Sequence, residues 1–383
     1  MVFQTELREK RCYTVIDLSA LKENLITAKK LLSPEMKVIG VVKANSYGLG
    51  SVRVAKAIQD EVWGFAVATY TEAVELQDAG IKKPILILSM IPEVCYVSCI
   101  ERDIRPTFYD DDNLKRFGEK AEKLGKTGLY HLAVDTGMTR IGLFPDESGF
   151  LTAKRMAEIP YTRAEGIYTH LATMDEEDPQ KAIAQMKAMK NFVERLQSAG
   201  LCYELVHAAN SAAMLLRGGF SDEGIFNASR YGISLYGAYP SEIRAFRKIP
   251  IRPVLSWYGR ITRITDVPEG TEIGYGGTYV TERKTRIATV AAGYADGYPR
   301  SLSSKGEVLI HGKRARILGR ICMDQFMVDV SEIPEAASGE FAVLMGKDGP
   351  EEITVEELSE RSGRFPYELF SLITPRVTRI YKE

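Results

Sequence analysis

The chain has 383 residues, of which 45% are hydrophobic and 26% are charged; these values exclude a disordered protein and leave room for about two or three domains. Fifty basic residues against 51 acidic ones give a formal net charge of -1, so no field of one sign predicts a nucleic acid, an anionic membrane or an acidic partner. We therefore expect a small-molecule partner.

The cysteines are few and scattered, and they form neither a CxxC pair nor a cluster with histidine. This pattern predicts reduced thiols in the cytoplasm and no metal site. The first residues, MVFQTELREKR, are charged where a signal peptide needs an apolar core, and no apolar run approaches the ~18 residues of a membrane span. We expect the protein to remain where it is made.

Short β-branched runs alternate with helical patterns along the first two thirds of the chain. The expected strands cover residues 13–18, 37–44, 63–69, 84–89, 105–110, 129–136, 165–172, 204–210 and 230–237. Apolar residues at three- and four-residue spacing predict helices between them, at residues 20–32, 71–80, 113–125 and 180–200. This alternation is typical of parallel strands joined by helices.

Nine such strands fit either a doubly wound sheet or an eight-stranded barrel whose chain begins with a strand that belongs elsewhere. Number and spacing favour the barrel, so we predict an α/β class with a (β/α)8 TIM-type barrel over residues 12–240. Beyond about residue 245 short strand-like runs are punctuated by turns such as PEG, HGK and KDGP. Residues 1–11 and 241–383 are therefore expected to form a mostly β domain, which takes up the first strand.

Polar residues collect at the carboxyl ends of the expected barrel strands, where barrel enzymes place their working groups. Lys43 ends one strand, Arg140 follows another, His170 ends a third, Ser211 follows a fourth and Arg230 opens the last. For an isolated lysine, a stem on apolar surface and a head in water is the common outcome. The alternative for Lys43 is a desolvated amine that condenses with a carbonyl.

The neighbours of Lys43 favour that alternative. In VVKANSYGLG a phenol follows at Tyr47, and Gly48 and Gly50 precede the next helix, where backbone amides could bind a phosphate. The segment closely resembles the pyridoxal-phosphate lysine segment of the alanine racemases. Further segments resemble that family in its order and spacing: VDTGMTRIG, YTHLATMDE, HAANSAA, SRYGISLYG, GYGGTY, GYADGYPR and GRICMDQF. The resemblance covers essentially the whole chain and implies a pyridoxal-phosphate barrel followed by a β domain.

The resemblance also implies a role for each matching position. Lys43 would hold pyridoxal phosphate covalently and act as the base on one face of the substrate α-carbon, with Tyr275 of the neighbouring subunit as the base on the other. The protein would then be a head-to-tail homodimer with active sites at the interface. The remaining implied sites are the cofactor contacts Tyr47, His170, Ser211, Arg230, Gly232 and Ile233, the substrate contacts Arg140 and Met323, and the entrance residues Tyr294 and Asp324.

Arg230 bears on the choice of reaction. The resemblance places its guanidinium against the ring nitrogen of the cofactor, and arginine keeps its proton. The ring nitrogen would then stay unprotonated, which disfavours transamination. From the sequence alone, a structural ion pair is the other explanation of Arg230.

Two positions depart from the family pattern. Ala133 occupies a position where many relatives carry a carbamylated lysine, so Arg140 must be oriented by an anion or another side chain. Pro375 stands where we place a family tyrosine beside the substrate, which would widen the pocket. Alanine is the expected substrate, with serine or a broad range that includes lysine as the alternative. A barrel-type decarboxylase and a non-catalytic pyridoxal-phosphate carrier are further alternatives.

Overall fold

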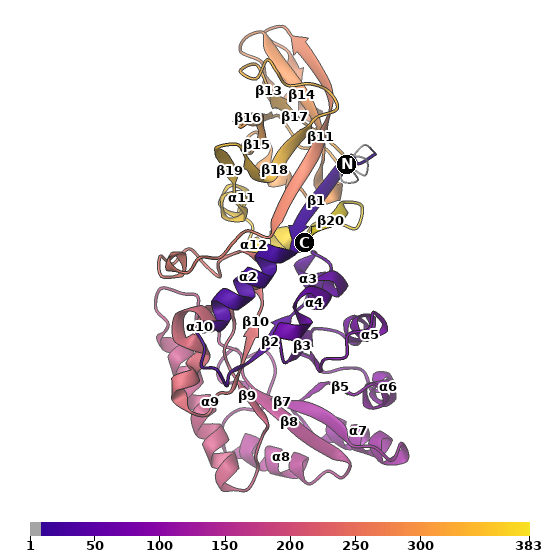
Figure 1. Cartoon of the computed structure of the whole chain (residues 1–383), viewed down its shortest axis with the longest axis vertical. Helices are drawn as coiled ribbons and strands as arrows, with labels where there is room; N and C mark the ends of the chain where they lie inside the picture. The colour runs from indigo at the N-terminus through magenta and orange to yellow at the C-terminus, as the bar shows by residue number, and fades with distance from the viewer. Residues whose placement is uncertain (1–8) are drawn as a thin grey trace.

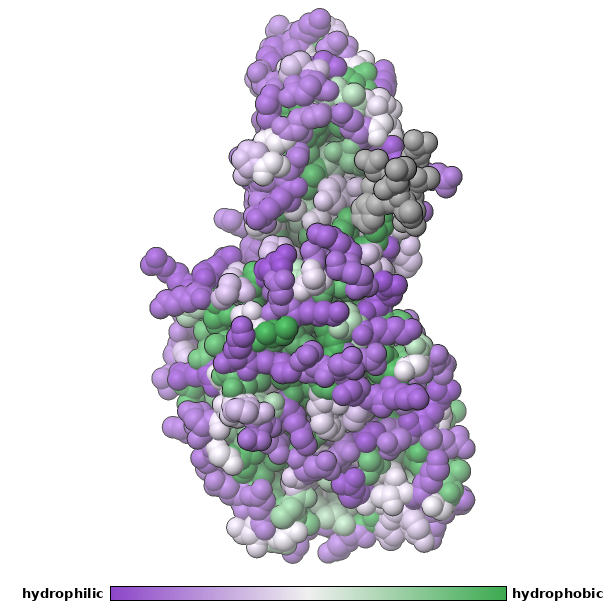
Figure 2. Space-filling model, in the orientation of Figure 1, coloured by the Kyte–Doolittle hydropathy of each residue, from purple (hydrophilic) through white to green (hydrophobic). Residues whose placement is uncertain are grey.

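The structure is a computed structural model that describes residues 9–383, so most of the charged N-terminal stretch lies outside the described residues. Figure 1 shows two parts stacked along the long axis, a barrel at one end and an extended β sheet at the other. The face shown in Figure 2 is mostly hydrophilic, with apolar patches interspersed among charged side chains. Within residues 9–383, none of the helices combines the length and the apolar character that a membrane crossing requires.

The first part is built from parallel strand segments. They are β2 (Lys37–Val41), β3 (Gly64–Val67), β4 (Ile85–Ile87), β5 (Ile104–Arg105), β6 (Thr107–Phe108), β7 (Gly128–Ala133), β8 (Thr162–Tyr168), β9 (Leu205–His207) and β10 (Ala228–Tyr231). They pair in the order β5-β4-β3-β2-β10-β9-β8-β7-β6. Every residue of β3, β4 and β9 is buried, which is typical of parallel strands covered on both faces.

The barrel closes because β5 and β6 are two halves of one strand. Only Pro106 separates them, and proline has no N–H with which to continue a ladder. β5 pairs with β4, and β6 pairs with β7. The nine segments therefore act as eight strands, which confirms the predicted (β/α)8 barrel over the doubly wound sheet.

The helices of this part follow the strands and pack outside them (Figure 1). They are α2 (Leu18–Lys29), α4 (Ser51–Ile58), α5 (Tyr70–Asp78), α6 (Tyr96–Glu101), α7 (Asp111–Lys123), α8 (Glu147–Ala157), α9 (Gln180–Ser198) and α10 (Ser211–Arg217). Five begin with a side-chain cap on a first-turn N–H, from Asp17, Thr69, Asp110, Asp146 and Asn210. The predicted strand 230–237 is shorter than expected: β10 ends at Tyr231, and Ile233–Tyr236 form a 3₁₀ turn.

The second part is a mostly antiparallel sheet. Its strands are β1 (Cys12–Asp17), β11 (Leu255–Val267), β14 (Thr285–Ala291), β15 (Glu307–Ile310), β16 (Lys313–Leu318), β17 (Phe326–Asp329), β18 (Phe341–Asp348), β19 (Glu351–Ile353) and β20 (Thr378–Lys382). A two-stranded ribbon, β12 (Glu272–Ile273) with β13 (Tyr279–Val280), and two helices, α11 (Val355–Ser362) and α12 (Pro366–Ser371), complete it.

The long strand β11 organises this sheet. It pairs with β14, with β18 and with β1, and β1 also pairs in parallel with β20. The first strand of the chain thus lies in the β domain, as the predicted fold class states. The expected boundary at residue 12 would cut β1 away from its partners, so we propose that the barrel begins after Asp17.

Candidate active site

A cavity of about 380 Å³ opens at the carboxyl ends of the barrel strands. Its walls carry residues from the ends of β2, β7, β8, β9 and β10, together with Tyr367 of α12 from the β domain. The structure thus brings together most of the predicted site: Lys43, Tyr47, Arg140, His170, Ser211, Arg230, Gly232 and Ile233 all line this cavity.

Lys43 stands two residues beyond the last residue of β2 and faces the cavity. Burial lowers the pKa of its amine, and the guanidinium groups of Arg140 and Arg230 lower it further, whereas the carboxylate of Glu72 opposes them. Because both burial and like charge disfavour the ammonium form, Lys43 is closer to a neutral nucleophile than an ordinary lysine.

A left-handed turn follows Lys43. Residues 44–47 all have φ between 52° and 53°, a region that costs an L-residue roughly 1–2 kcal/mol each. Backbone bonds hold the turn, from Gly48 N–H to the Ala44 carbonyl at 2.9 Å and from Gly50 N–H to the Asn45 carbonyl at 2.8 Å. A Cβ at Gly48 would lie 2.4 Å from a backbone oxygen of α12, so this position needs glycine both for space and for its φ of 87°.

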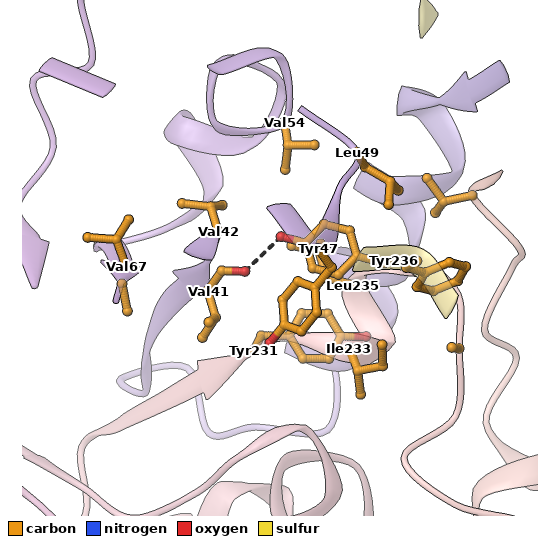
Figure 3. Packing of buried hydrophobic residues seen from close by; sticks show 14 of the residues in the cluster. Val41, Val42, Tyr47, Leu49, Val54, Val67, Tyr231, Ile233, Leu235 and Tyr236 are labelled. Carbon is orange, nitrogen blue, oxygen red and sulfur yellow. Dashed lines mark hydrogen bonds between the residues drawn. The ribbon is translucent and has the colours of Figure 1, made fainter. Parts of the chain in front are cut away.

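The turn directs the ring of Tyr47 into an aromatic group at the cavity wall (Figure 3). Its centroid lies 4.9 Å from that of Tyr236 and 6.0 Å from that of Tyr367. Tyr236 is itself fixed, because its hydroxyl donates to the carbonyl of Val41 at 2.7 Å. Burial raises the pKa of Tyr47, so its hydroxyl stays protonated and can donate to an anion.

Opposite Tyr47 lies a concave wall suited to a phosphate. Ser211 accepts a hydrogen bond from Gly232 N–H at 2.9 Å, and Ile233 begins the 3₁₀ turn that follows. A Cβ at Gly232 would stand 2.9 Å from the Tyr47 hydroxyl and would fill the space between them. The hydroxyls of Tyr47 and Ser211, and the space left because Gly232 has no side chain, form a cradle that fits the phosphate of pyridoxal phosphate.

Arg230 is buried without a carboxylate partner among residues 9–383. One terminal nitrogen donates to the Thr169 carbonyl at 2.7 Å and to the Ala208 carbonyl at 3.0 Å, and the other lies 2.6 Å from His207 Nδ1. Burial, and next the charge of Arg140, lower the pKa of Arg230 to about 10, so it remains charged at neutral pH. Among residues 9–383 the structure thus pairs Arg230 with neutral acceptors and not in the ion pair considered from the sequence.

A buried chain of hydrogen-bonding groups extends from Arg230 through the barrel. His207 Nε2 lies 3.1 Å from His131 Nδ1, and His131 Nε2 lies 3.4 Å from a carboxylate oxygen of Glu165. Arg105 holds that carboxylate with two bonds of 3.0 and 3.2 Å. Burial lowers the pKa of both histidines, so each is a neutral ring that accepts from the Arg230 side and donates toward Glu165.

His170 lies at the end of the same group, 3.3 Å from Arg230 through Nδ1. Burial, followed by the charges of Arg230, Arg140 and Lys43, lowers the pKa of His170 to about 3. It is therefore neutral, and Nδ1 accepts from Arg230, which leaves the Nε2 proton to meet a ligand or a tyrosine.

Arg140 is positioned through its backbone. The carboxylate of Asp135 accepts the N–H groups of residues 137–140 at distances of 2.9 to 3.0 Å, and it fixes the loop after β7. Burial raises the pKa of Asp135, but these four bonds lower it below its usual range. Ala133 lines the same cavity as Arg140 and brings no amine to it.

The other predicted residues lie on the β domain, away from this cavity. Tyr275 and Tyr294 line a separate hollow of about 240 Å³, and Tyr275 is 72% exposed. Met323 is also exposed, and Asp324 pairs with Arg376 at 2.6 Å. Within one chain, Lys43 and Tyr275 therefore do not face a common space.

The wider pocket expected from Pro375 stays a prediction. Pro375 is absent from the residues that line the cavity, whereas Tyr367, eight positions earlier, lies in its wall and packs parallel to Phe365 with ring centroids 4.5 Å apart. α12 thus supplies an aromatic ring to the cavity wall. The signal for it was the aromatic pair around Pro366 in FPYELF, which precedes a short helix.

The cavity at the mouth of the (β/α)8 barrel holds a desolvated lysine and two arginines beside a phosphate-sized cradle. These groups indicate an enzyme that uses an amine in its chemistry and binds anionic ligands. Residues 16–240 match the family described as "Alanine racemase, N-terminal domain", and residues 254–381 match "Alanine racemase, C-terminal domain". The chain belongs to the alanine racemase family.

Individual proteins agree with this assignment. The alanine racemase of Methanococcus maripaludis is 41% identical over 96% of this chain and 97% of its own, and that of Desulforamulus reducens is 40% identical over the same shares. Among solved structures, the alanine racemase of Clostridium difficile 630 has a TM-score of 0.91 at 34% identity, over 98% of this chain and 96% of its own. The Bacillus anthracis enzyme with bound L-Ala-P has a TM-score of 0.88 at 36% identity, over 98% and 95%.

Proposed function

We propose that the protein is a pyridoxal-phosphate-dependent racemase that interconverts L- and D-alanine. Lys43, Arg140 and Arg230, which line one cavity beside the cradle of Tyr47, Ser211 and Gly232, carry this proposal. Relatives of similar length named alanine racemase support the substrate. Tyr367 adds an aromatic ring to the cavity wall, which supports alanine over serine or lysine.

The residues of the cavity suit pyridoxal phosphate. Tyr47, Ser211, Gly232 and Ile233 would bind the phosphate, and Lys43 would hold the aldehyde carbon. When bound, the cofactor would supply an electron-withdrawing ring that takes up the charge left by a departing α-proton. Arg230 would meet the ring nitrogen with a donor that keeps its proton, a pairing that suppresses transamination.

Racemisation needs a proton removed from one face and returned to the other. Lys43, with its lowered pKa, would serve one face, and Arg140 would orient the substrate carboxylate by its two-pronged guanidinium. Tyr275 of the partner subunit would serve the opposite face, with Met323, Tyr294 and Asp324 of the same surface near the entrance. The exposure of Tyr275 supports a homodimer in which that surface meets the barrel of the other copy.

The expected location is the cytoplasm, as the sequence predicts, and the free state of every cysteine supports a reducing compartment.

Two measurements test the reaction. The purified protein should absorb in the visible range, and borohydride should trap the cofactor on the peptide that contains Lys43. In deuterated water, either alanine enantiomer should gain deuterium at the α-carbon and reach equal amounts of both forms. Release of carbon dioxide would indicate a decarboxylase, and a trapped cofactor without α-exchange of any amino acid would indicate a carrier.

Hybrid dimers test the shared site. Lys43→Ala and Tyr275→Phe should each be inactive alone, but co-expressed under two affinity tags they form hybrids with one intact site. If subunits mix at random, about a quarter of the wild-type activity returns, because half of the dimers are hybrids with one working site of two. No recovery in purified hybrids would show that both residues act from one chain.

A further inference from the structure

Glu72 connects the lysine loop to its neighbour in the barrel. It lies in the first turn of α5, where it forms a capping box with Thr69. One carboxylate oxygen accepts the N–H of Ala44 at 2.6 Å, and the other accepts the N–H groups of Ala68 at 2.8 Å and Thr69 at 3.1 Å. A single side chain thus joins the loop after β2 to the loop after β3.

The contact with Ala44 lies where the backbone is most strained. Ala44 directly follows Lys43 and is the first of four consecutive non-glycine residues with positive φ. A bond to its N–H restrains the peptide that joins Lys43 to the left-handed turn, and therefore the direction in which the lysine leaves the backbone. Asn45 restrains the far side, since its side chain accepts Ser51 N–H at 2.9 Å.

The charge of Glu72 also acts on Lys43. Arg140 on the loop after β7, Arg230 on β10 and Glu72 on α5 act on the charge of Lys43. The cavity that Lys43 faces is also lined by the neutral His170 and by Asp135 and Asp175. Among the described groups that act on its amine, Glu72 is the acidic one, and it opposes two arginines. Ala133 cannot carry a carbamate, so β7 adds no negative charge of that kind to the charge of Glu72.

We propose that Glu72 is a positioning residue for Lys43, which anchors the strained turn behind the lysine and offsets the positive field of Arg140 and Arg230 on its amine. The chemistry for which Lys43 is positioned rests on the proposed function. The anchoring and the charge effect are properties of the chain and can be measured without turnover.

Three variants separate the two effects. Glu72→Gln retains an oxygen for Ala44 N–H but removes the charge, whereas Glu72→Ala removes both. Glu75→Gln is the matched control, because Glu75 is an exposed acid on the same helix. In each full-length protein, freed of cofactor with hydroxylamine, the rate at which acetic anhydride labels Lys43 is followed against pH by mass spectrometry of its peptide.

Loss of the Glu72 charge should lower the pKa of Lys43, so Glu72→Gln should label about three- to tenfold faster than wild type at a pH below the labelling midpoint. Glu72→Ala should show the same shift and also faster protease cleavage within residues 44–50. Labelling midpoints equal to those of wild type and Glu75→Gln would overturn the charge effect, and unchanged cleavage in Glu72→Ala would overturn the anchoring.

Turnover is then measured separately in the cofactor-loaded proteins. The kcat of Glu72→Gln should fall at least tenfold with its pH profile displaced, while Glu75→Gln matches wild type. If wild type itself racemises no amino acid, the proposed function fails, but the labelling and cleavage results still decide the role of Glu72.

Discussion

Glu165→Gln tests the buried chain that ends at Arg230. In the native protein the carboxylate receives two bonds from Arg105, at 3.0 and 3.2 Å, and lies 3.4 Å from His131. Glutamine would keep one acceptor and turn an N–H₂ group toward the guanidinium, which leaves a buried arginine partly unpaired. Removing one partner of such a pair costs about 3–5 kcal/mol of the free energy of unfolding.

The pKa of Glu165 gives a similar magnitude. Burial raises it, but hydrogen bonds from His131 and Arg105 and the charge of Arg105 lower it from 4.5 to about 2. A lowering of roughly 2.5 units corresponds to about 3 kcal/mol. Because the folded-state pKa is depressed, this stabilisation is fully present above pH 4.5 and is lost as the pH falls toward 2.

Urea unfolding of wild type and variant measures both the size and the pH dependence. The difference should be about 3 kcal/mol and constant from pH 8 to pH 5, and it should shrink below pH 4.5. Glu204→Gln is the control, since Glu204 is about half exposed and lies 3.5 Å from Arg163, where a pair contributes about 0–1 kcal/mol. A difference below about 1 kcal/mol at pH 7 would refute the buried-pair argument.

Three further outcomes follow from the site. Gly232→Ala should weaken pyridoxal phosphate binding about 10–100-fold in absorbance titrations, because its Cβ would stand 2.9 Å from the Tyr47 hydroxyl; unchanged affinity would place the phosphate elsewhere. Tyr275→Phe should reduce L-alanine turnover by at least about 100-fold while cofactor affinity is retained; equal loss of both would show a structural role. Tyr367→Ala should admit larger amino acids in a substrate panel whereas Pro375→Tyr should leave the panel unchanged, and a panel narrowed by Pro375→Tyr would show that position 375 borders the substrate.

The sequence predicts the barrel because its signals are local. Each β-branched run and each helical period lies within a short window, and parallel strands follow from their alternation. Two features of the barrel were not predicted: the break at Pro106, which divides one strand between two neighbours, and the exact end of β10. Both depend on the closure of the strands into a ring, which no short window of sequence shows. The sequence assigns β1 to the β domain only because a ninth strand has no place in an eight-stranded barrel.

The site was predicted unevenly for a related reason. Lys43, Arg140 and Arg230 were found because each occupies a segment that resembles the family. Glu72 was not identified, because its bond to Ala44 joins residues 28 positions apart and no local pattern marks it. Tyr367 was not identified either, because FPYELF lies outside the segments that resemble the family.

The separation of Lys43 from Tyr275 explains why a protein of this design would act as a dimer. Tyr275 is 72% exposed on the β domain, whereas Lys43 faces the barrel cavity together with Arg140 and Arg230. On the proposed function, inserting the phenol of one subunit into the cavity of the other would complete the pair of bases. Neither the cavity nor the exposed tyrosine alone would provide both bases, so on the proposed function assembly and catalysis would depend on the same surface.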